Sequence, residues 1–275
     1  DPARGTPAGL VRIEVRGDDI GGTRSAFVHV PSGPGPWPVI VAYHGGRNNS
    51  GLEMEPRFHD RHDQNILFVY PNGLSPPGGT GTGWVGPEHA AIVDPMRDVN
   101  FARALIAELD RRYDIDRSRV YATGFSNGAY ATDLLWCHAS DLFHGFFVVS
   151  RAMPVAMSQQ CPASPPRPYA LMLGTADDGL HNAYQMSFPD SLAFVRRQLA
   201  CDPDPAVVTL PDRGDRTTVT RSTWSGCAKG AAFEYFEIAG GGHHWPGHGK
   251  PVDDKSRDVD ATDEVLKFFR EHGGL

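Results

Sequence analysis

The sequence contains no apolar run that approaches the roughly 18 consecutive residues needed for a bilayer-spanning helix. Its longest apolar runs are short, such as residues 39–43 and 146–149. Basic residues are also in the minority, with 26 Lys and Arg against 33 Asp and Glu and a formal net charge of -7. Nucleic-acid binding normally rests on clustered Lys and Arg. We therefore expect neither a membrane partner nor a nucleic-acid partner.

Cysteine is scarce as well, and none of the four cysteines forms a C-x-x-C metal or redox motif. They fall into two pairs that are local in the sequence, Cys137 with Cys161 and Cys201 with Cys227. Three connectivities are possible for four cysteines, and we expect two disulfides; buried free thiols in a cytosolic enzyme are the alternative. The first residue, Asp1, suits a mature form after signal removal and equally a trimmed chain. We expect a secreted protein, extracellular or periplasmic.

Apolar segments alternate with helical patterns along most of the chain. With 275 residues, of which 40% are hydrophobic and 21% charged, the sequence fits a single α/β domain over residues 1–275, which we expect to be a monomer. Residues 11–15 and 25–30 alternate apolar and polar positions, which predicts an antiparallel pair at a sheet edge. Continuous apolar runs with intervening helices predict a doubly wound, mostly parallel α/β sheet. Strands are expected at 39–43, 66–70, 120–121, 145–150, 169–174 and 233–238, and helices at 52–64, 100–112, 129–136, 187–199 and 262–272.

The most informative motif is G-x-S-x-G at residues 124–128, between a predicted strand and a predicted helix. This order is that of a nucleophile elbow, where a sharp turn lifts a serine hydroxyl above the sheet and the glycines allow close backbone packing. A serine nucleophile needs a base within hydrogen-bond reach and a group that orients the base. The motif predicts Ser126 as a nucleophile; a serine in an ordinary helix-starting turn is the alternative.

An acid and a base follow Ser126 in the chain order that α/β-hydrolases use. The apolar strand at 169–174 leads into a loop with two adjacent carboxylates, of which Asp177 is our first choice and Asp178 the alternative. A glycine-rich turn then presents two histidines, and we prefer His243 over His244 as the base. For the oxyanion, we expect backbone N–H donors at Gly46 and Asn127.

Four sequence blocks together resemble the esterase/polyhydroxybutyrate-depolymerase family of α/β-hydrolases, which includes feruloyl and acetylxylan esterases. The blocks are residues 98–105, 119–128, 174–177 and 240–247, and the resemblance runs from about residue 37 to residue 273. It implies that Ser126, Asp177 and His243 are nucleophile, acid and base, and that the two cysteine pairs form disulfides. The chain departs from the family pattern in two places. Gly46 stands at the third position of the oxyanion loop, which often reads H-G-C in the family, and residues 179–182 stand where the family usually has V-P-Y after the acid.

The resemblance implies a secreted serine carboxylic-ester hydrolase that needs no cofactor. Its substrate is expected to be a feruloyl, acetyl or other short ester of a polysaccharide; a polyester is the alternative, and a peptidase or a non-catalytic binding module are rivals. We expect no metal site, because the histidines at 243, 244 and 248 lack carboxylate or cysteine partners at ligand spacing. Loop-like flanks suggest that Trp84 and Trp245 are exposed near the cleft. The remaining candidates for the pocket are Tyr43, Arg47 and Tyr184, and the glycine-rich stretch 76–83 is expected at its mouth.

Overall fold

A computed structural model describes residues 7–46, 49–75, 81–86, 90, 93–162, 165–180 and 183–275. Its described strands join in one sheet with the order β1-β2-β4-β3-β5-β6-β7-β10-β9-β8. The strands are β1 (Val11–Gly17), β2 (Gly22–His29), β3 (Trp37–Tyr43), β4 (Leu67–Pro71), β5 (Ile115–Phe125), β6 (Gly145–Val149), β7 (Tyr169–Gly174), β8 (Ala206–Thr209), β9 (Thr218–Trp224) and β10 (Phe233–Ala239). Neighbours from β4 to β10 in this order run parallel, and the outer pairs at both ends run antiparallel.

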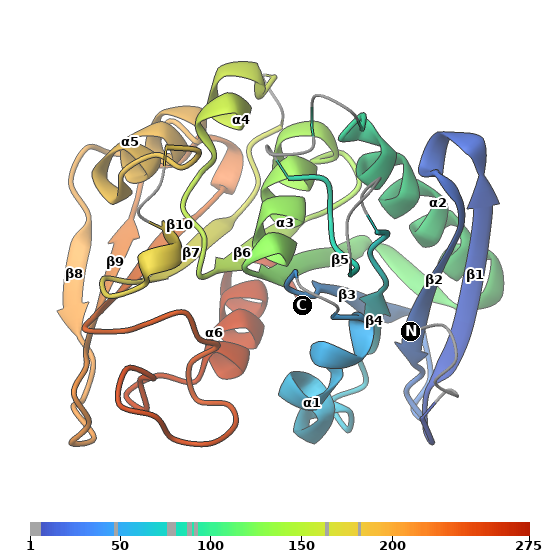
Figure 1. The fold of residues 1–275 in the computed structure, drawn as a ribbon, viewed down its shortest axis with the longest axis horizontal. Helices are drawn as coiled ribbons and strands as arrows, with labels where there is room; N and C mark the ends of the chain where they lie inside the picture. Colours follow the sequence, from blue (N-terminus) through green and yellow to red (C-terminus); the bar gives the residue numbers. More distant parts are fainter. Residues whose placement is uncertain are drawn as a thin grey trace.

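Helices cover both faces of the sheet, as Figure 1 shows. They are α1 (Glu55–Phe58), α2 (Met96–Arg112), α3 (Asn127–His138), α4 (Val155–Gln160), α5 (Phe188–Gln198) and α6 (Ala261–Phe268). Helices α2, α3 and α5 pack on one face with Val39 and Val41, whereas α1 and α6 pack on the other with Ile40 and Ala42. The continuous apolar run of β3 thus serves two cores, because successive side chains of a strand point to opposite faces.

The predicted doubly wound sheet with antiparallel N-terminal edge strands is confirmed. One predicted helix is wrong: residues 52–64 form a 3-10 turn at Gly51–Glu53, the short α1 and a second 3-10 turn at His59–Arg61. Pro56 explains the break, because its ring would clash with the carbonyl of the residue four positions earlier in a continuous helix. The sequence reading also missed β8, β9 and α4. Within the described residues, no helix combines the length and apolar character that a membrane span requires.

Both cysteine pairs form disulfides, as predicted. Cys137 on α3 joins Cys161 just after α4, and Cys201 joins Cys227 between β9 and β10. Each bridge closes a short segment, with sequence separations of 24 and 26 residues. No cysteine of the chain is free, so the alternative of buried thiols is wrong.

Candidate active site

The candidate site lies where adjacent parallel strands reach the carboxyl edge of the sheet. Ser126 directly follows β5, Asp177 follows β7, and His243 follows β10. Gly46 follows β3, the neighbour of β5 on the other side. Loops after such strands meet at one edge of an open parallel sheet, which is where ligands bind in this architecture. The strand order therefore brings together four residues that are far apart in the sequence.

The turn at Ser126 has the strained geometry of a nucleophile elbow. Ser126 has φ 57° and ψ -114°, a conformation that L-residues rarely adopt and that surrounding contacts must hold. Its N–H donates to the carbonyl of Val149 at 3.0 Å, which ties the elbow to β6. The two glycines are required by space: a Cβ on Gly124 would lie 2.2 Å from the Gly128 carbonyl oxygen, and one on Gly128 would lie 2.0 Å from that of Tyr43.

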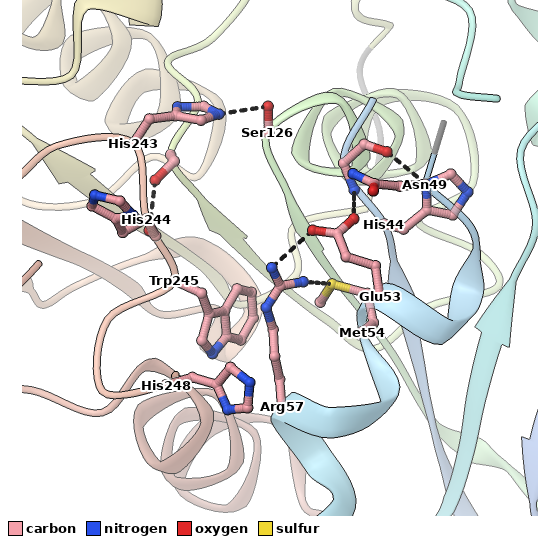
Figure 2. A network of polar contacts seen from close by, with 12 residues as sticks. His44, Asn49, Glu53, Met54, Arg57, Ser126, His243, His244, Trp245 and His248 are labelled. Atoms are coloured by element: carbon pink, nitrogen blue, oxygen red, sulfur yellow. Dashed lines mark hydrogen bonds and ion pairs between the residues drawn. The ribbon is translucent and has the colours of Figure 1, made fainter. Parts of the chain in front are cut away.

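Ser126, His243 and Asp177 form one hydrogen-bonded chain. The His243 Nε2 lies 2.8 Å from the Ser126 Oγ, and its Nδ1 lies 2.7 Å from the Asp177 Oδ2. A carboxylate only accepts hydrogen bonds, so the Nδ1 carries the proton and the Nε2 is left to accept one from the serine hydroxyl. Asp177 is completely buried and also accepts from the Gly179 N–H at 3.0 Å. Figure 2 shows the His243 ring directed at Ser126.

The two alternative residues point elsewhere. Asp178 is exposed and begins the 3-10 turn Asp178–Leu180. The His244 Nε2 lies 2.9 Å from the Asp254 Oδ1, and the His244 carbonyl accepts from the Ser150 hydroxyl at 3.0 Å. The expectation that the histidines of this loop have no carboxylate partner is therefore wrong for His244. Its contacts anchor the loop that presents His243.

The two predicted oxyanion donors adjoin each other beside Ser126. Both Gly46 and Asn127 line the same cavity, and a Cβ on Gly46 would lie 3.5 Å from that of Asn127. Asn127 is the first residue of α3, where a backbone N–H has no acceptor within its own helix. The Gly45 N–H, by contrast, already donates to the Glu53 Oε2 at 2.8 Å. Gly46 and Asn127 therefore border the same part of the cavity as Ser126.

The Asn127 side chain fixes one wall of this cavity. Its Oδ1 accepts from the Trp84 N–H at 2.7 Å, and its Nδ2 donates to the Trp84 carbonyl at 3.2 Å. The cavity holds about 740 Å³, which is in the range of ligand pockets for small molecules. Its apolar lining comes from Leu74, Trp84, Val85, Val93 and Phe125, and its two cations are Arg97 and Arg151. From the glycine-rich stretch 76–83, residues 81–83 line the cavity, and residues 76–80 lie outside the described part of the chain.

The expected exposure of the two tryptophans is wrong. Trp84 is 4% exposed and Trp245 is 3% exposed. Each indole N–H has a buried acceptor, the His44 carbonyl at 2.9 Å for Trp84 and the Thr262 hydroxyl oxygen at 3.1 Å for Trp245. The glycines beside them form turns that direct the rings inward rather than toward solvent. Of this pair, only Trp84 lines the cavity.

The other pocket candidates are distributed differently. Tyr43 is buried under Trp84, with their ring centroids 5.0 Å apart, and it does not line the cavity. Tyr184 is 58% exposed and is also absent from the lining, and Arg47 lies outside the described residues. Two clusters elsewhere bring metal-ligating atoms within 4.8 Å of one another, Glu55/His59/His62 and Glu234/Glu271/His272. Neither cluster includes a residue of the cavity lining.

The loop that carries Gly46 is held by one buried and one partly buried side chain that the sequence reading missed. The His44 Nε2 accepts from the Gly73 N–H at 2.9 Å, so its Nδ1 carries the proton and donates to the Gly45 carbonyl at 2.6 Å. Burial lowers the pKa of His44 to about 4, which keeps the ring neutral near pH 7. The second side chain is Glu53, which accepts from the Gly45 N–H.

Arg57 connects Glu53 to the other two catalytic loops. Its Nη2 donates to the Glu53 Oε1 at 2.8 Å, and its guanidinium lies 4.9 Å from the Phe125 ring and 5.4 Å from the Trp245 ring. Phe125 precedes Ser126, and Trp245 is two residues beyond His243, so Arg57 contacts residues of the elbow and of the histidine loop while it pairs with Glu53. Figure 2 shows Arg57 between Glu53 and Trp245. The sequence contains one signal for this pair, because Glu53 and Arg57 have the i, i+4 spacing of a helical ion pair and follow soon after the His-Gly-Gly turn.

We expect Glu53→Gln to lower kcat by about tenfold with little change in KM, because a neutral partner leaves Arg57 unpaired and loosens the Gly45–Gly46 backbone. The measurement is steady-state kinetics on p-nitrophenyl acetate together with a thermal unfolding curve. Glu108→Gln is the matched control, since Glu108 pairs with Arg111 and Arg112 on the outer surface of α2. Equal kcat values for both variants would contradict the positioning role of Glu53.

Known proteins with similar sequences are esterases by name. The chain is 24% identical over 233 residues to the bifunctional acetylxylan esterase/xylanase XynS20E of Neocallimastix patriciarum, which covers 81% of this chain and 31% of that protein. It is 28% identical over 287 residues to NocK of Nocardia uniformis subsp. tsuyamanensis, a protein that carries the name esterase, covering 90% of this chain and 77% of NocK. The chain thus spans about a third of the first relative's length. No family model matches the sequence.

Solved structures give the same fold. The acetyl xylan esterase from Aspergillus awamori superposes with a TM-score of 0.67 at 16% identity, over 94% of this chain and 99% of that one. A ferulic acid esterase from Anaeromyces mucronatus superposes with a TM-score of 0.56 at 18% identity, over 89% and 90% of the two chains. Sheet order and helix layers give the chain the α/β-hydrolase fold. The relatives by sequence carry esterase names, in agreement with the resemblance that the sequence motifs gave.

Proposed function

We propose that the protein is a serine carboxylic-ester hydrolase that works through an acyl-enzyme formed on Ser126. The observation that carries this proposal is the hydrogen-bonded chain from Ser126 through His243 to Asp177 at the wall of a large cavity. A serine, a histidine and a buried carboxylate in this order are the arrangement that activates a hydroxyl for attack on an acyl carbon. The esterase names of the relatives support the same chemistry.

The proposed reaction uses residues of this chain alone. The Ser126 Oγ attacks the ester carbonyl while the His243 Nε2 takes the hydroxyl proton, and the buried Asp177 carboxylate stabilises the resulting imidazolium. The N–H groups of Gly46 and Asn127 stabilise the oxyanion of the tetrahedral intermediate. His243 then gives its proton to the leaving alkoxide, and the alcohol departs. A water molecule then attacks the acyl carbon while His243 takes one of its protons. His243 returns that proton to the Ser126 Oγ as the acyl–oxygen bond breaks, which releases the carboxylic acid and restores the free enzyme.

We propose short feruloyl- or acetyl-type esters of polysaccharides as the substrates. The named relatives include an acetylxylan esterase, and solved structures with the same fold include an acetyl xylan esterase and a ferulic acid esterase. A cavity of about 740 Å³ accommodates an acyl group of this size. A polyester depolymerase uses the same chemistry and is the alternative. The two disulfides support a secreted location, because such bonds persist in oxidising compartments.

The experiment that tests this function compares kcat/KM for methyl ferulate, acetylated xylan and a hydroxybutyrate oligomer. We expect measurable turnover of one or both polysaccharide-type esters and at least about tenfold lower values for the oligomer, a difference of roughly 1.4 kcal/mol in transition-state binding. Stoichiometric labelling of Ser126 by a fluorophosphonate separates an esterase from a non-catalytic binding module. Turnover of amide substrates in the absence of ester turnover would identify a peptidase instead.

A further inference from the structure

A second cavity of about 550 Å³ adjoins the candidate active site. Its walls come from the β2 strand, the end of β4 with the residues that follow it, and the segment that precedes α1. Asn49, Leu74 and Thr82 line both cavities, so the two spaces share a boundary. The Thr82 hydroxyl donates to the Asn49 carbonyl on this boundary. The two cavities are therefore neighbours, which is the arrangement that a substrate longer than a simple ester needs in order to occupy both.

The charged groups that line the second cavity are already paired within the protein. Arg12 lies 2.7 Å from Glu14, Arg24 lies 2.8 Å from Asp98, and Glu53 is bound by Arg57. Arg24 is in addition 2% exposed, with its guanidinium 4.0 Å from the Phe101 ring. A charged ligand would compete with these internal partners for each of the groups. The cavity therefore suits a ligand without net charge.

The uncharged polar groups of the lining are available to a ligand. The hydroxyls of Thr23, Ser50 and Ser75 make no hydrogen bond to any part of the chain that the structure describes. The Ser25 Oγ accepts from the Asn72 Nδ2 at 3.0 Å, which leaves its own proton free to donate. Apolar side chains alternate with these groups, namely Phe27, Leu52 and Leu74. Hydroxyl groups beside apolar patches match a sugar ring, which offers hydroxyls at its edge and C–H groups on its faces.

We propose that the second cavity binds the hydroxyl-rich alcohol part of the substrate, a sugar unit of a polysaccharide ester, while the acyl group occupies the cavity at Ser126. The inference rests on the proposed esterase function and makes it more specific. A polyester chain offers ester oxygens as acceptors but has no hydroxyl donors along its length, so it would leave the acceptors of this lining without partners. Such unpaired polar groups are how a site rejects an analogue that lacks hydroxyls.

Thr23→Trp tests the proposal, because an indole at this exposed strand position fills the second cavity. We expect the ratio of kcat/KM for an acetylated xylo-oligosaccharide to that for p-nitrophenyl acetate to fall by at least about tenfold, the loss of roughly two hydrogen bonds. Thr218→Trp is the matched control, since Thr218 is an exposed strand threonine on β9, near the opposite edge of the sheet. That variant should keep the wild-type ratio.

Direct binding gives a second readout that does not depend on turnover. The Ser126→Ala variant should bind an unesterified xylo-oligosaccharide, which an NMR titration detects as chemical-shift changes. The double variant with Ser126→Ala and Thr23→Trp should show no such changes. An unchanged ratio of the two kcat/KM values in Thr23→Trp would contradict the proposed sugar site. Equal binding of the xylo-oligosaccharide by Ser126→Ala and by the double variant would contradict it as well. If Thr23→Trp lowered the turnover of a hydroxybutyrate oligomer but not that of the acetylated xylo-oligosaccharide, a sugar would be the wrong ligand for this cavity. Failure of the esterase proposal itself is distinguishable, because the wild-type protein would then leave p-nitrophenyl acetate intact.

Discussion

Ser126→Ala is expected to lower kcat on p-nitrophenyl acetate by about six orders of magnitude. The substitution removes the Oγ that lies 2.8 Å from the His243 Nε2 and leaves no other nucleophile in the chain of hydrogen bonds. Binding should persist, because the cavity and the Gly46 and Asn127 amides are unchanged. Single-turnover kinetics on freshly purified protein measures the loss, because a trace of contaminating esterase contributes little to the signal under these conditions.

Ser150→Ala is the matched control for this prediction. Ser150 lines the same cavity and also has a positive φ of 56°, but its hydroxyl donates to the His244 carbonyl rather than to His243. We expect a loss of less than about tenfold, the size of one neutral hydrogen bond. Retention of full activity by Ser126→Ala would overturn the proposed mechanism.

Asp177→Asn is expected to lower kcat by about four orders of magnitude while the fold is retained. The Asp177 carboxylate accepts a hydrogen bond from the His243 Nδ1–H at 2.7 Å, which keeps the proton on the Nδ1 and leaves the Nε2 free to accept the serine proton. An amide at this position can donate to the Nδ1 instead, which moves the proton to the Nε2 and blocks proton transfer from Ser126. The pH dependence of kcat/KM and a circular dichroism spectrum together distinguish this effect from unfolding.

Asp178→Asn separates the two neighbouring carboxylates. Asp178 is exposed at the start of a 3-10 turn, and in the described residues it makes no hydrogen bond to His243. Exposed substitutions of this kind usually change free energies by less than about 0.5 kcal/mol, so we expect activity within about twofold of the wild type. A severe loss in Asp178→Asn with near-normal activity in Asp177→Asn would reverse the assignment.

The side chains around the proposed oxyanion loop explain how its backbone is held in place. Gly45 is held from one side by the neutral His44 and from the other by Glu53, whose charge is balanced by Arg57. Both Glu53 and Arg57 are largely removed from water, with side chains 19% and 11% exposed. Breaking such a pair costs more than the pair contributes, since the remaining charge is left without a partner. The expected fall in kcat for Glu53→Gln follows from this, because the substitution leaves the Arg57 charge without its partner.

The second cavity bears on the choice between polysaccharide esters and polyesters. The reaction at Ser126 is the same for both, so residues that contact the carbonyl cannot distinguish them. Discrimination must come from groups that contact the rest of the substrate, and the hydroxyls of Thr23, Ser50 and Ser75, which have no partner among the described residues, are suited to a sugar. The predicted monomeric state and the extent of the domain over residues 1–275 stay predictions.

The sequence by itself determined the elements that depend on local patterns. Alternating and continuous apolar runs predicted the antiparallel edge and the parallel strands, because side-chain periodicity reflects which faces of a strand are buried. The G-x-S-x-G turn and the order of serine, acid and histidine indicated a hydrolase site, since the backbone approach at Gly124 and Gly128 tolerates no Cβ. Strands β8 and β9 were missed because their mixed pattern carries little of this periodic signal.

Only the tertiary structure decided between neighbouring side chains and revealed contacts across the chain. Asp177 and Asp178 are adjacent and chemically equivalent, as are His243 and His244, and the direction of each depends on loop geometry that no local pattern encodes. The buried indole of Trp84 finds its acceptor at His44, 40 residues away in the sequence, and that of Trp245 finds its acceptor at Thr262, 17 residues away. The Arg57 contacts and the second cavity likewise join segments far apart in the chain, because long-range packing brings them together.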